Sequence, residues 1–179
     1  YKGFNAVINP PIQIPNLMNI KMVVCGYSHT VCIDNEGNLF TFGSNEFGLG
    51  FATKEKYELP FTYVPHQVTD IPQINFISCG TNFTMCITND RTVYSFGDNE
   101  YGQLGIGNNN NCSTPQLIQD FNDIENIICG ENYSICKTYA NEYYSWGYNY
   151  YGQLGQRNYE HCNKPIKCSN WPEDIVDIK

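Results

Sequence analysis

The sequence repeats itself about every 50 residues, and this repeat constrains the fold more than any other feature. A Cys-Gly pair marks each copy, in steps of 54 and 50 residues, at Cys25-Gly26, Cys79-Gly80 and Cys129-Gly130. An aromatic-Gly pair follows in the same steps, at Phe42-Gly43, Phe96-Gly97 and Trp146-Gly147. A Leu-Gly pair comes next, at Leu49-Gly50, Leu104-Gly105 and Leu154-Gly155. A proline is the fourth mark, at Pro11, Pro65, Pro115 and Pro165. Four marks in one register indicate one structural unit that is used several times.

Each copy contains four short runs typical of β-strands. In the first copy, one run leads into the Cys-Gly pair (19–24), one follows it (28–33) and one ends at the aromatic-Gly pair (39–42). A fourth run follows the proline, as residues 116–118 follow Pro115. The composition, 15% aromatic residues with 15 glycines, also favours strands and tight turns. Four short strands in a repeat of this length predict an all-β fold, a β-propeller of four-stranded blades.

The repeats divide the chain into one partial propeller, residues 1–179. We expect copies at about 11–64, 65–114 and 115–164, and the start of a fourth at 165–179. The chain therefore holds about three and a half blades.

Nine glycines recur in register, and we interpret them as structural residues of the repeat. After a strand, the chain turns with positive φ or passes close to another backbone, and glycine does this at little cost. The nine are Gly26, Gly80 and Gly130, then Gly43, Gly97 and Gly147, then Gly50, Gly105 and Gly155.

Six of the nine cysteines also follow the repeat. They are Cys25, Cys79 and Cys129 and, seven residues later in each copy, Cys32, Cys86 and Cys136. We expect them to be small buried hydrophobic side chains. The odd total and the lack of any Cys-x-x-Cys pair predict neither a disulfide framework nor a metal site, and indicate an intracellular compartment, cytoplasmic or nuclear.

Charge and motifs exclude several function classes. The net charge of -8 argues against direct nucleic-acid binding, since phosphate contacts need a basic face. No apolar run reaches the roughly 18 residues of a membrane span. Serine-hydrolase, phosphate-loop and His-Glu-x-x-His motifs are absent, so we expect no catalytic residue, no cofactor and no enzyme activity. His29 shares its repeat position with Phe83 and Tyr133, which predicts a packing role between blades.

Three runs resemble the regulator of chromosome condensation family. They are Cys-Gly-x-x-His-Thr-x-Cys-Ile (25–33), Tyr-Ser-Phe-Gly-Asp-Asn-Glu-Tyr-Gly-Gln-Leu-Gly (94–105) and Tyr-Ser-Trp-Gly-Tyr-Asn-Tyr-Tyr-Gly-Gln-Leu-Gly (144–155). The resemblance implies a seven-bladed propeller, so the chain is expected to be a fragment whose remaining blades complete the ring. The alternative is a short chain that oligomerises to cover its end blades.

The resemblance implies one of two functions. The first is guanine-nucleotide exchange on, or binding of, a small GTPase; the alternative is a non-catalytic protein-protein interaction scaffold in a larger signalling or ubiquitin-ligase protein. The first copy has 15 residues from Gly50 to Pro65, against 10 in the others. Loops on a rigid scaffold often contact partners, so we select Lys54, Lys56, Tyr57 and Phe61 as interaction residues; the alternative is a longer solvated loop.

Overall fold

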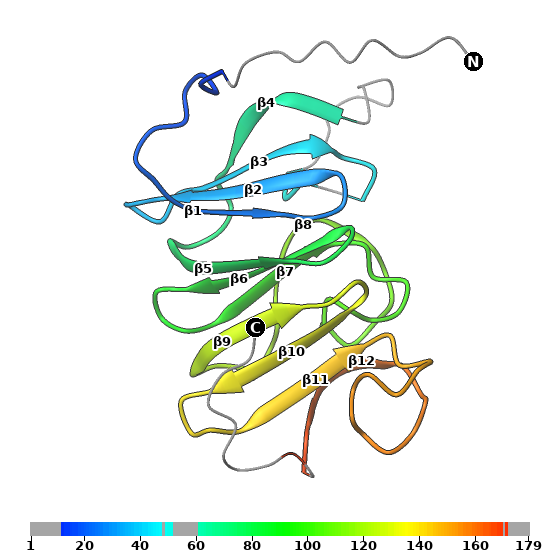
Figure 1. Ribbon diagram of the computed structural model, residues 1–179. Helices are drawn as coiled ribbons and strands as arrows, with labels where there is room; N and C mark the ends of the chain where they lie inside the picture. The colour runs from blue at the N-terminus through cyan, green and yellow to red at the C-terminus, as the bar shows by residue number, and fades with distance from the viewer. Residues whose placement is uncertain (1–11, 48, 52–60, 170, 172–179) are drawn as a thin grey trace, which may run out of the picture.

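The computed structural model describes residues 12–47, 49–51, 61–169 and 171, and there the chain forms twelve strands and no helix (Figure 1). The first sheet contains β1 (Ile20–Cys25), β2 (His29–Asp34), β3 (Leu39–Ser44) and β4 (Phe61–Val68). The second contains β5 (Ile74–Cys79), β6 (Phe83–Thr88), β7 (Val93–Gly97) and β8 (Cys112–Leu117). The third contains β9 (Ile124–Cys129), β10 (Tyr133–Thr138), β11 (Tyr143–Gly147) and β12 (Cys162–Lys167). The predicted all-β architecture of four-stranded blades is confirmed.

Each sheet is an antiparallel meander in which strands adjacent in sequence pair with one another. The register repeats between sheets: His29 of β2 pairs with Gly43 of β3, as Phe83 pairs with Gly97 and Tyr133 with Gly147. The same repeat position therefore has the same place in each sheet.

The sheets divide the chain differently from the sequence repeats. Pro65, Pro115 and Pro165, with which the expected copies begin, lie inside β4, β8 and β12, the last strand of the preceding sheet. These three strands are edge strands, where a residue without an N–H group is tolerated because no neighbour needs its bond. The expected fourth copy thus begins with the last strand of the third sheet, and residues 170 and 172–179 lie outside the described part.

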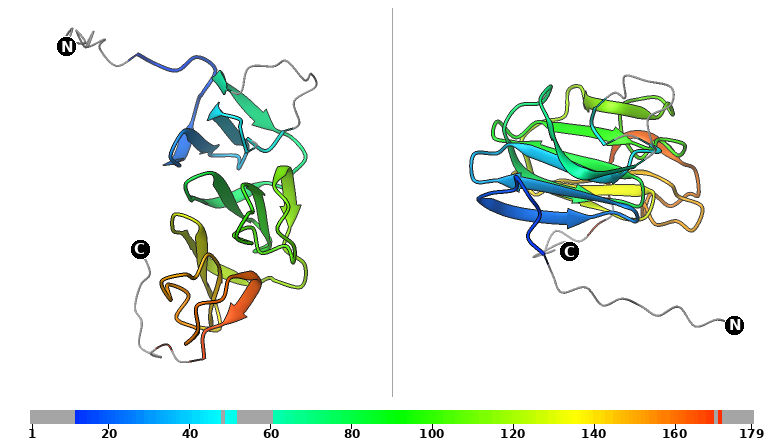
Figure 2. Two further views of the ribbon diagram at one scale, coloured as in Figure 1. Left: turned by 90° about the vertical axis from the view of Figure 1, so that its right-hand side faces the viewer. Right: turned by 90° about the horizontal axis from the view of Figure 1, so that it is seen from above.

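The sheets pack face to face in chain order (Figures 1 and 2), and the first strand of each contacts the first two strands of the sheet before it. Two hydrophobic cores fill the interfaces. Buried residues between the first and second sheets are Val31, Ile33, Leu39, Val68, Ile74, Ile77, Cys86 and Phe96. Those between the second and third are Phe83, Met85, Ile87, Val93, Leu104, Ile118, Ile124, Ile127, Cys136 and Trp146.

The turns between the first and second strands of the three sheets also contact one another. Tyr27 N–H donates to the carbonyl of Thr81 at 2.9 Å, and Thr81 N–H donates to that of Glu131 at 3.0 Å. A Cβ atom on Gly26 would lie 2.8 Å from the carbonyl oxygen of Gly80, and one on Gly80 would lie 2.7 Å from that of Gly130. Glycine is therefore required for the close approach of neighbouring blades at these turns.

The first sheet has one uncovered face in the described structure. Val23 pairs with Cys32 as Ile77 pairs with Cys86 and Ile127 with Cys136. Yet Val23 is 56% exposed, whereas Ile77 and Ile127 are 1% and 0% exposed.

The expectation that all six repeat cysteines are buried is wrong for Cys25. Its thiol is exposed, because no described sheet covers that face. Cys32, Cys86 and Cys136 are buried as expected, and Cys79 and Cys129 are half-buried.

Candidate functional site

The region selected from the sequence lies on and beside β4. Lys54, Lys56 and Tyr57 fall outside the described residues. Phe61 is the first residue of β4 and is 54% exposed. Two further apolar residues of β4, Tyr63 and Val64, are 86% and 52% exposed. We call Phe61, Tyr63 and Val64 the β4 strip.

Among the described strands, the backbone of β4 is hydrogen-bonded to a neighbouring strand on one side only. β4 pairs with β3, with Phe61 opposite Ser44, and it forms the edge of the first sheet. The rings of Phe51 and His66 have centroids 3.9 Å apart, which joins the start of the insertion to the strand. An edge strand with exposed apolar side chains can take both main-chain hydrogen bonds and hydrophobic contacts from a partner.

A second region is built by the long loops that precede β8 and β12. The carboxamide of Asn99 holds the first loop: its Oδ1 accepts from Leu104 N–H at 3.0 Å, and its Nδ2 donates to the carbonyls of Asn108 and Asn110 at 2.9 and 3.0 Å. Asn149 makes the equivalent bonds in the second loop. Both asparagines are fully buried, so these loops are rigid supports for the side chains they carry.

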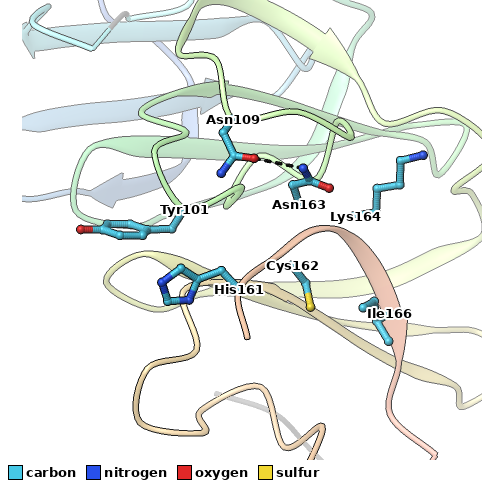
Figure 3. A pocket seen from close by; sticks show the side chains of 7 residues that line it. All are labelled: Tyr101, Asn109, His161, Cys162, Asn163, Lys164 and Ile166. Atoms are coloured by element: carbon cyan, nitrogen blue, oxygen red, sulfur yellow. Dashed lines mark hydrogen bonds between the residues drawn. The ribbon is translucent and has the colours of Figure 1, made fainter. Parts of the chain in front are cut away.

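A cavity of about 300 Å³ lies between the two loops (Figure 3). Its lining residues are Tyr101, Asn109, His161, Cys162, Asn163, Lys164 and Ile166. Asn163 Nδ2 donates to Asn109 Oδ1 at 3.0 Å across it. Tyr101 and His161 lie at one end of the cavity and Lys164 at the other (Figure 3). His161 Nδ1 accepts from the backbone N–H of Asn149 at 3.0 Å, which leaves the ring proton on Nε2.

Aromatic rings continue from this cavity onto the surface. Tyr148 contacts Tyr101, Tyr150, Tyr151 and His161, with ring centroids 4.7, 6.4, 6.3 and 4.9 Å away. We call these four tyrosines the tyrosine surface. It was not predicted from the sequence. The available signal was that Tyr148 and Tyr150 replace Asp98 and Glu100 of the preceding copy.

Family models for the regulator of chromosome condensation (RCC1) repeat match residues 36–87, 90–136 and 141–179, most of the chain. A second model of the same repeat matches 20–49 and 74–103. The chain belongs to the RCC1 repeat family. The resemblance inferred from the sequence is confirmed.

Curated relatives of this RCC1-repeat chain are much longer proteins. It is 34% identical over 124 residues to the human E3 ubiquitin-protein ligase HERC2, covering 65% of the chain and 2% of the ligase. It is 35% identical over 102 residues to the ultraviolet-B receptor UVR8 of Arabidopsis thaliana, covering 55% of the chain and 22% of the receptor. The X-linked retinitis pigmentosa GTPase regulator of Canis lupus familiaris is 39% identical over 112 residues, covering 60% of the chain and 10% of that protein.

Solved structures agree with the fold. Human WBSCR16 superposes with a TM-score of 0.70 and 26% identity, over 83% of this chain and 40% of that one. Prp20p of Saccharomyces cerevisiae superposes with a TM-score of 0.76 and 17% identity, over 87% of this chain and 39% of that one. The three sheets of the RCC1-repeat chain therefore correspond to part of a propeller.

The nine repeat glycines lie at three kinds of contact in the RCC1 repeat. Gly26, Gly80 and Gly130 each lie under the ring three residues later, so that a Cβ on Gly80 would be 1.9 Å from Phe83 Cε1. Gly43, Gly97 and Gly147 have φ between +103° and +116° and lie against the backbone of the paired strand. Gly50, Gly105 and Gly155 pack against the aromatic side chains of Phe96, Trp146 and Trp171.

Burial changes the acidity of several cysteine thiols in this RCC1-repeat chain. Burial raises the pKa of the Cys79 thiol to about 12 and raises that of Cys86 and Cys129 as well, which makes these thiols poor nucleophiles. No group of three or more His, Cys, Asp or Glu side chains within the described ranges is arranged to hold a metal. The same ranges contain no helix able to span a membrane.

Proposed function

We propose that this chain is a protein-binding part of an RCC1-type propeller, that its partner is a small GTPase, and that binding promotes nucleotide release. The β4 strip carries the proposal: it has three exposed apolar side chains on a strand whose outer edge pairs with no other strand of the described residues. Within a chain of this family, the strip offers a rigid apolar edge at the base of the enlarged β3–β4 connection. Such a partner would place the chain in the cytoplasm or nucleus.

The action that fits this edge needs no covalent step. Nucleotide leaves a GTPase faster when a partner stabilises the conformation that holds it weakly. Contacts from the β4 strip and the insertion that contains Lys54, Lys56 and Tyr57 would supply that differential binding. Two relatives support a GTPase partner: Prp20p binds Gsp1p and histones, and another relative is named a GTPase regulator.

Nucleotide release tests the proposal. The full chain is added to small GTPases loaded with a fluorescent GDP, and release is followed with and without the Phe61→Ala variant. We expect the wild type to accelerate nucleotide release from one GTPase by about tenfold or more. Phe61→Ala should lose most of that gain, because truncating an aromatic side chain that becomes buried in a complex costs roughly 2 kcal/mol or more.

Tyr27→Ala is the matched control. Tyr27 is 85% exposed on the first sheet but lies outside the β4 strip, so its truncation should leave the release rate unchanged. Equal losses in the two variants, or no acceleration and no binding for any GTPase, would contradict the proposal.

A scaffold function is the second candidate, and one observation favours it. The chain spans between 2% and 22% of the length of the three curated relatives above, so similar repeats serve as one part of larger proteins that include a ubiquitin ligase. In the release assay, a scaffold would bind a partner through the β4 strip, with affinity reduced by Phe61→Ala, but would not change the rate of nucleotide release.

A further inference from the structure

The tyrosine surface departs from the repeat in a way that the fold does not require. In the second sheet, Asp98 supports its loop: its carboxylate accepts from the backbone N–H of Glu100 at 3.2 Å and from Gln103 Nε2 at 3.1 Å. Tyr148 has the equivalent position in the third copy and has no carboxylate to accept these bonds. The loop of the third copy therefore lacks these two hydrogen bonds and carries an aromatic ring at this position.

The neighbouring position changes in the same direction. Tyr150 replaces Glu100, so a charged, solvated side chain becomes a ring that is 64% exposed. Tyr151 beside it is 78% exposed. Tyr148 is half-buried against Tyr101 and His161, whereas the rings of Tyr150 and Tyr151 stay exposed. Exposed rings placed together on a loop that lacks these hydrogen bonds indicate a binding role.

The rings form one connected group with open faces. Tyr150 and Tyr151 meet edge to face with centroids 5.1 Å apart, and Tyr148 links them to Tyr101. The buried carboxamides of Asn99 and Asn149 fix the two loops from below. The surface is therefore prepared before a ligand arrives, which lowers the entropy cost of binding.

The segments that carry these rings have more acidic than basic side chains. The two loops and the adjoining turn carry Asp98, Glu100, Glu131 and Glu160, against a single Arg157. Glu131 is close enough to Tyr148 to act on its phenol, whose pKa is raised by burial first and by Tyr151, Tyr101, Tyr150 and Glu131 in turn. Lys164 lies at the far end of the cavity, away from Tyr101 and His161 (Figure 3).

We propose that the tyrosine surface binds an arginine-bearing segment of a partner protein, with guanidinium groups stacked on the rings of Tyr148, Tyr150 and Tyr151 and attracted by Glu131. The planar guanidinium stacks on aromatic faces and is less strongly hydrated than an ammonium group, so arginine gains more than lysine from these rings. The site is on the second and third sheets, apart from the β4 strip, and does not depend on a GTPase partner.

The acidic side chains of these segments favour an arginine-bearing peptide over a nucleic acid as the ligand. Exposed tyrosines also stack on unpaired bases, but sites that do so combine the rings with a positive groove along the phosphates. Here the charge has the opposite sign, which attracts a basic peptide and repels a phosphate backbone.

The test uses a fluorescent peptide, Gly-Arg-Gly-Arg-Gly-Arg-Gly, titrated with the full chain and followed by anisotropy. Matched probes carry lysine or the neutral isostere citrulline in place of arginine, and a labelled oligouridine tests nucleic acid. We expect the arginine peptide to bind most tightly, lysine more weakly, and citrulline and oligouridine much more weakly. The double variant Tyr150→Ala/Tyr151→Ala should weaken arginine-peptide binding by about fivefold or more.

Three variants separate ring stacking from other causes. Tyr150→Phe keeps the ring and should retain most of the affinity, and Glu131→Gln should weaken binding and reduce its dependence on salt. Tyr27→Ala removes a tyrosine that is 85% exposed and lies outside both the tyrosine surface and the β4 strip, and it should leave arginine-peptide binding unchanged. Equal affinity for the arginine and citrulline peptides, tighter binding of oligouridine, or equal losses in Tyr27→Ala and the double variant would overturn the proposal.

Discussion

The ring three residues after the glycine of each Cys-Gly pair is a residue that can contact two blades, as His29 shows. His29 is 8% exposed, and its Nε2 is 3.1 Å from the hydroxyl of Thr84 in the second sheet. Its ring also occupies the space that a side chain on Gly26 would need, since a Cβ there would be 2.1 Å from His29 Cε1. The predicted packing role of His29 between blades is confirmed.

Lower pH should destabilise the fold through His29. Burial lowers the pKa of the His29 imidazole from its ordinary 6.5, so the folded state keeps the ring neutral while the unfolded chain takes up a proton near that pH. Stability is therefore fully present above about pH 6.5 and is lost as the pH falls below it. Urea unfolding at pH 7.5 and 5.5 measures the loss.

His29→Phe provides the matched variant, because Phe83 shows that the site accepts a phenyl ring. The variant should cost about 1 kcal/mol at pH 7.5, since the Thr84 hydroxyl loses its hydrogen bond to the imidazole. It should lose less stability than the wild type between pH 7.5 and 5.5. A larger pH effect in the variant would show that His29 is not held neutral.

The repeat glycines could be interpreted from the sequence, but the tyrosine surface could not. The spacing of Gly26, Gly80 and Gly130 predicted either a positive φ or a close backbone approach, and the structure shows the close approach. The tyrosine surface was missed because Tyr148 and Tyr150 are far apart from Tyr101 in sequence, and only the packing of adjacent blades brings the rings together.

Among the elements, the long loops of the second and third sheets depend on one asparagine each. We predict that Asn99→Ala lowers the free energy of unfolding by about 2–4 kcal/mol, because it leaves one buried N–H and two carbonyls without their partner. Urea unfolding measures the loss, and chymotrypsin cleavage at Tyr101 reports the opening of the loop.

Asn110→Ala is the control for that prediction. Asn110 lies in the same loop with an exposed side chain, and its carbonyl, which Asn99 uses, remains. We expect a change within about 0.5 kcal/mol. Comparable losses in the two variants would mean that the Asn99 carboxamide does not hold the loop.

The strands themselves were predictable, but their grouping was not. Short β-branched runs and flanking turns predicted strands at 19–24 and 39–42, and the structure has β1 at Ile20–Cys25 and β3 at Leu39–Ser44. A periodic sequence carries no information about where one unit begins, so the strands with Pro65, Pro115 and Pro165 were placed at the start of a copy. Hydrogen bonding to β3, β7 and β11 makes them the last strand of each sheet.

For the molecule as a whole, stability is expected to come from neighbouring blades in pairs, as in other repeat proteins. Ile77 lies in the core between the first two sheets, and Val23 has the same position on the open face of the first. We predict that Ile77→Ala costs about 2–5 kcal/mol and that Val23→Ala costs less than about 1 kcal/mol. Urea unfolding of both variants makes the comparison, and equal losses would show that the face with Val23 is covered in solution.

The bonds from Tyr27 to Thr81 and from Thr81 to Glu131 use only peptide groups. Tyr27, Thr81 and Glu131 therefore form the same kind of contact between sheets although their side chains differ, because the side chains take no part in it. Selection can therefore change the side chains displayed at these turns one residue at a time while the backbone bonds between the sheets are kept. Such freedom lets one scaffold acquire new partners without being rebuilt.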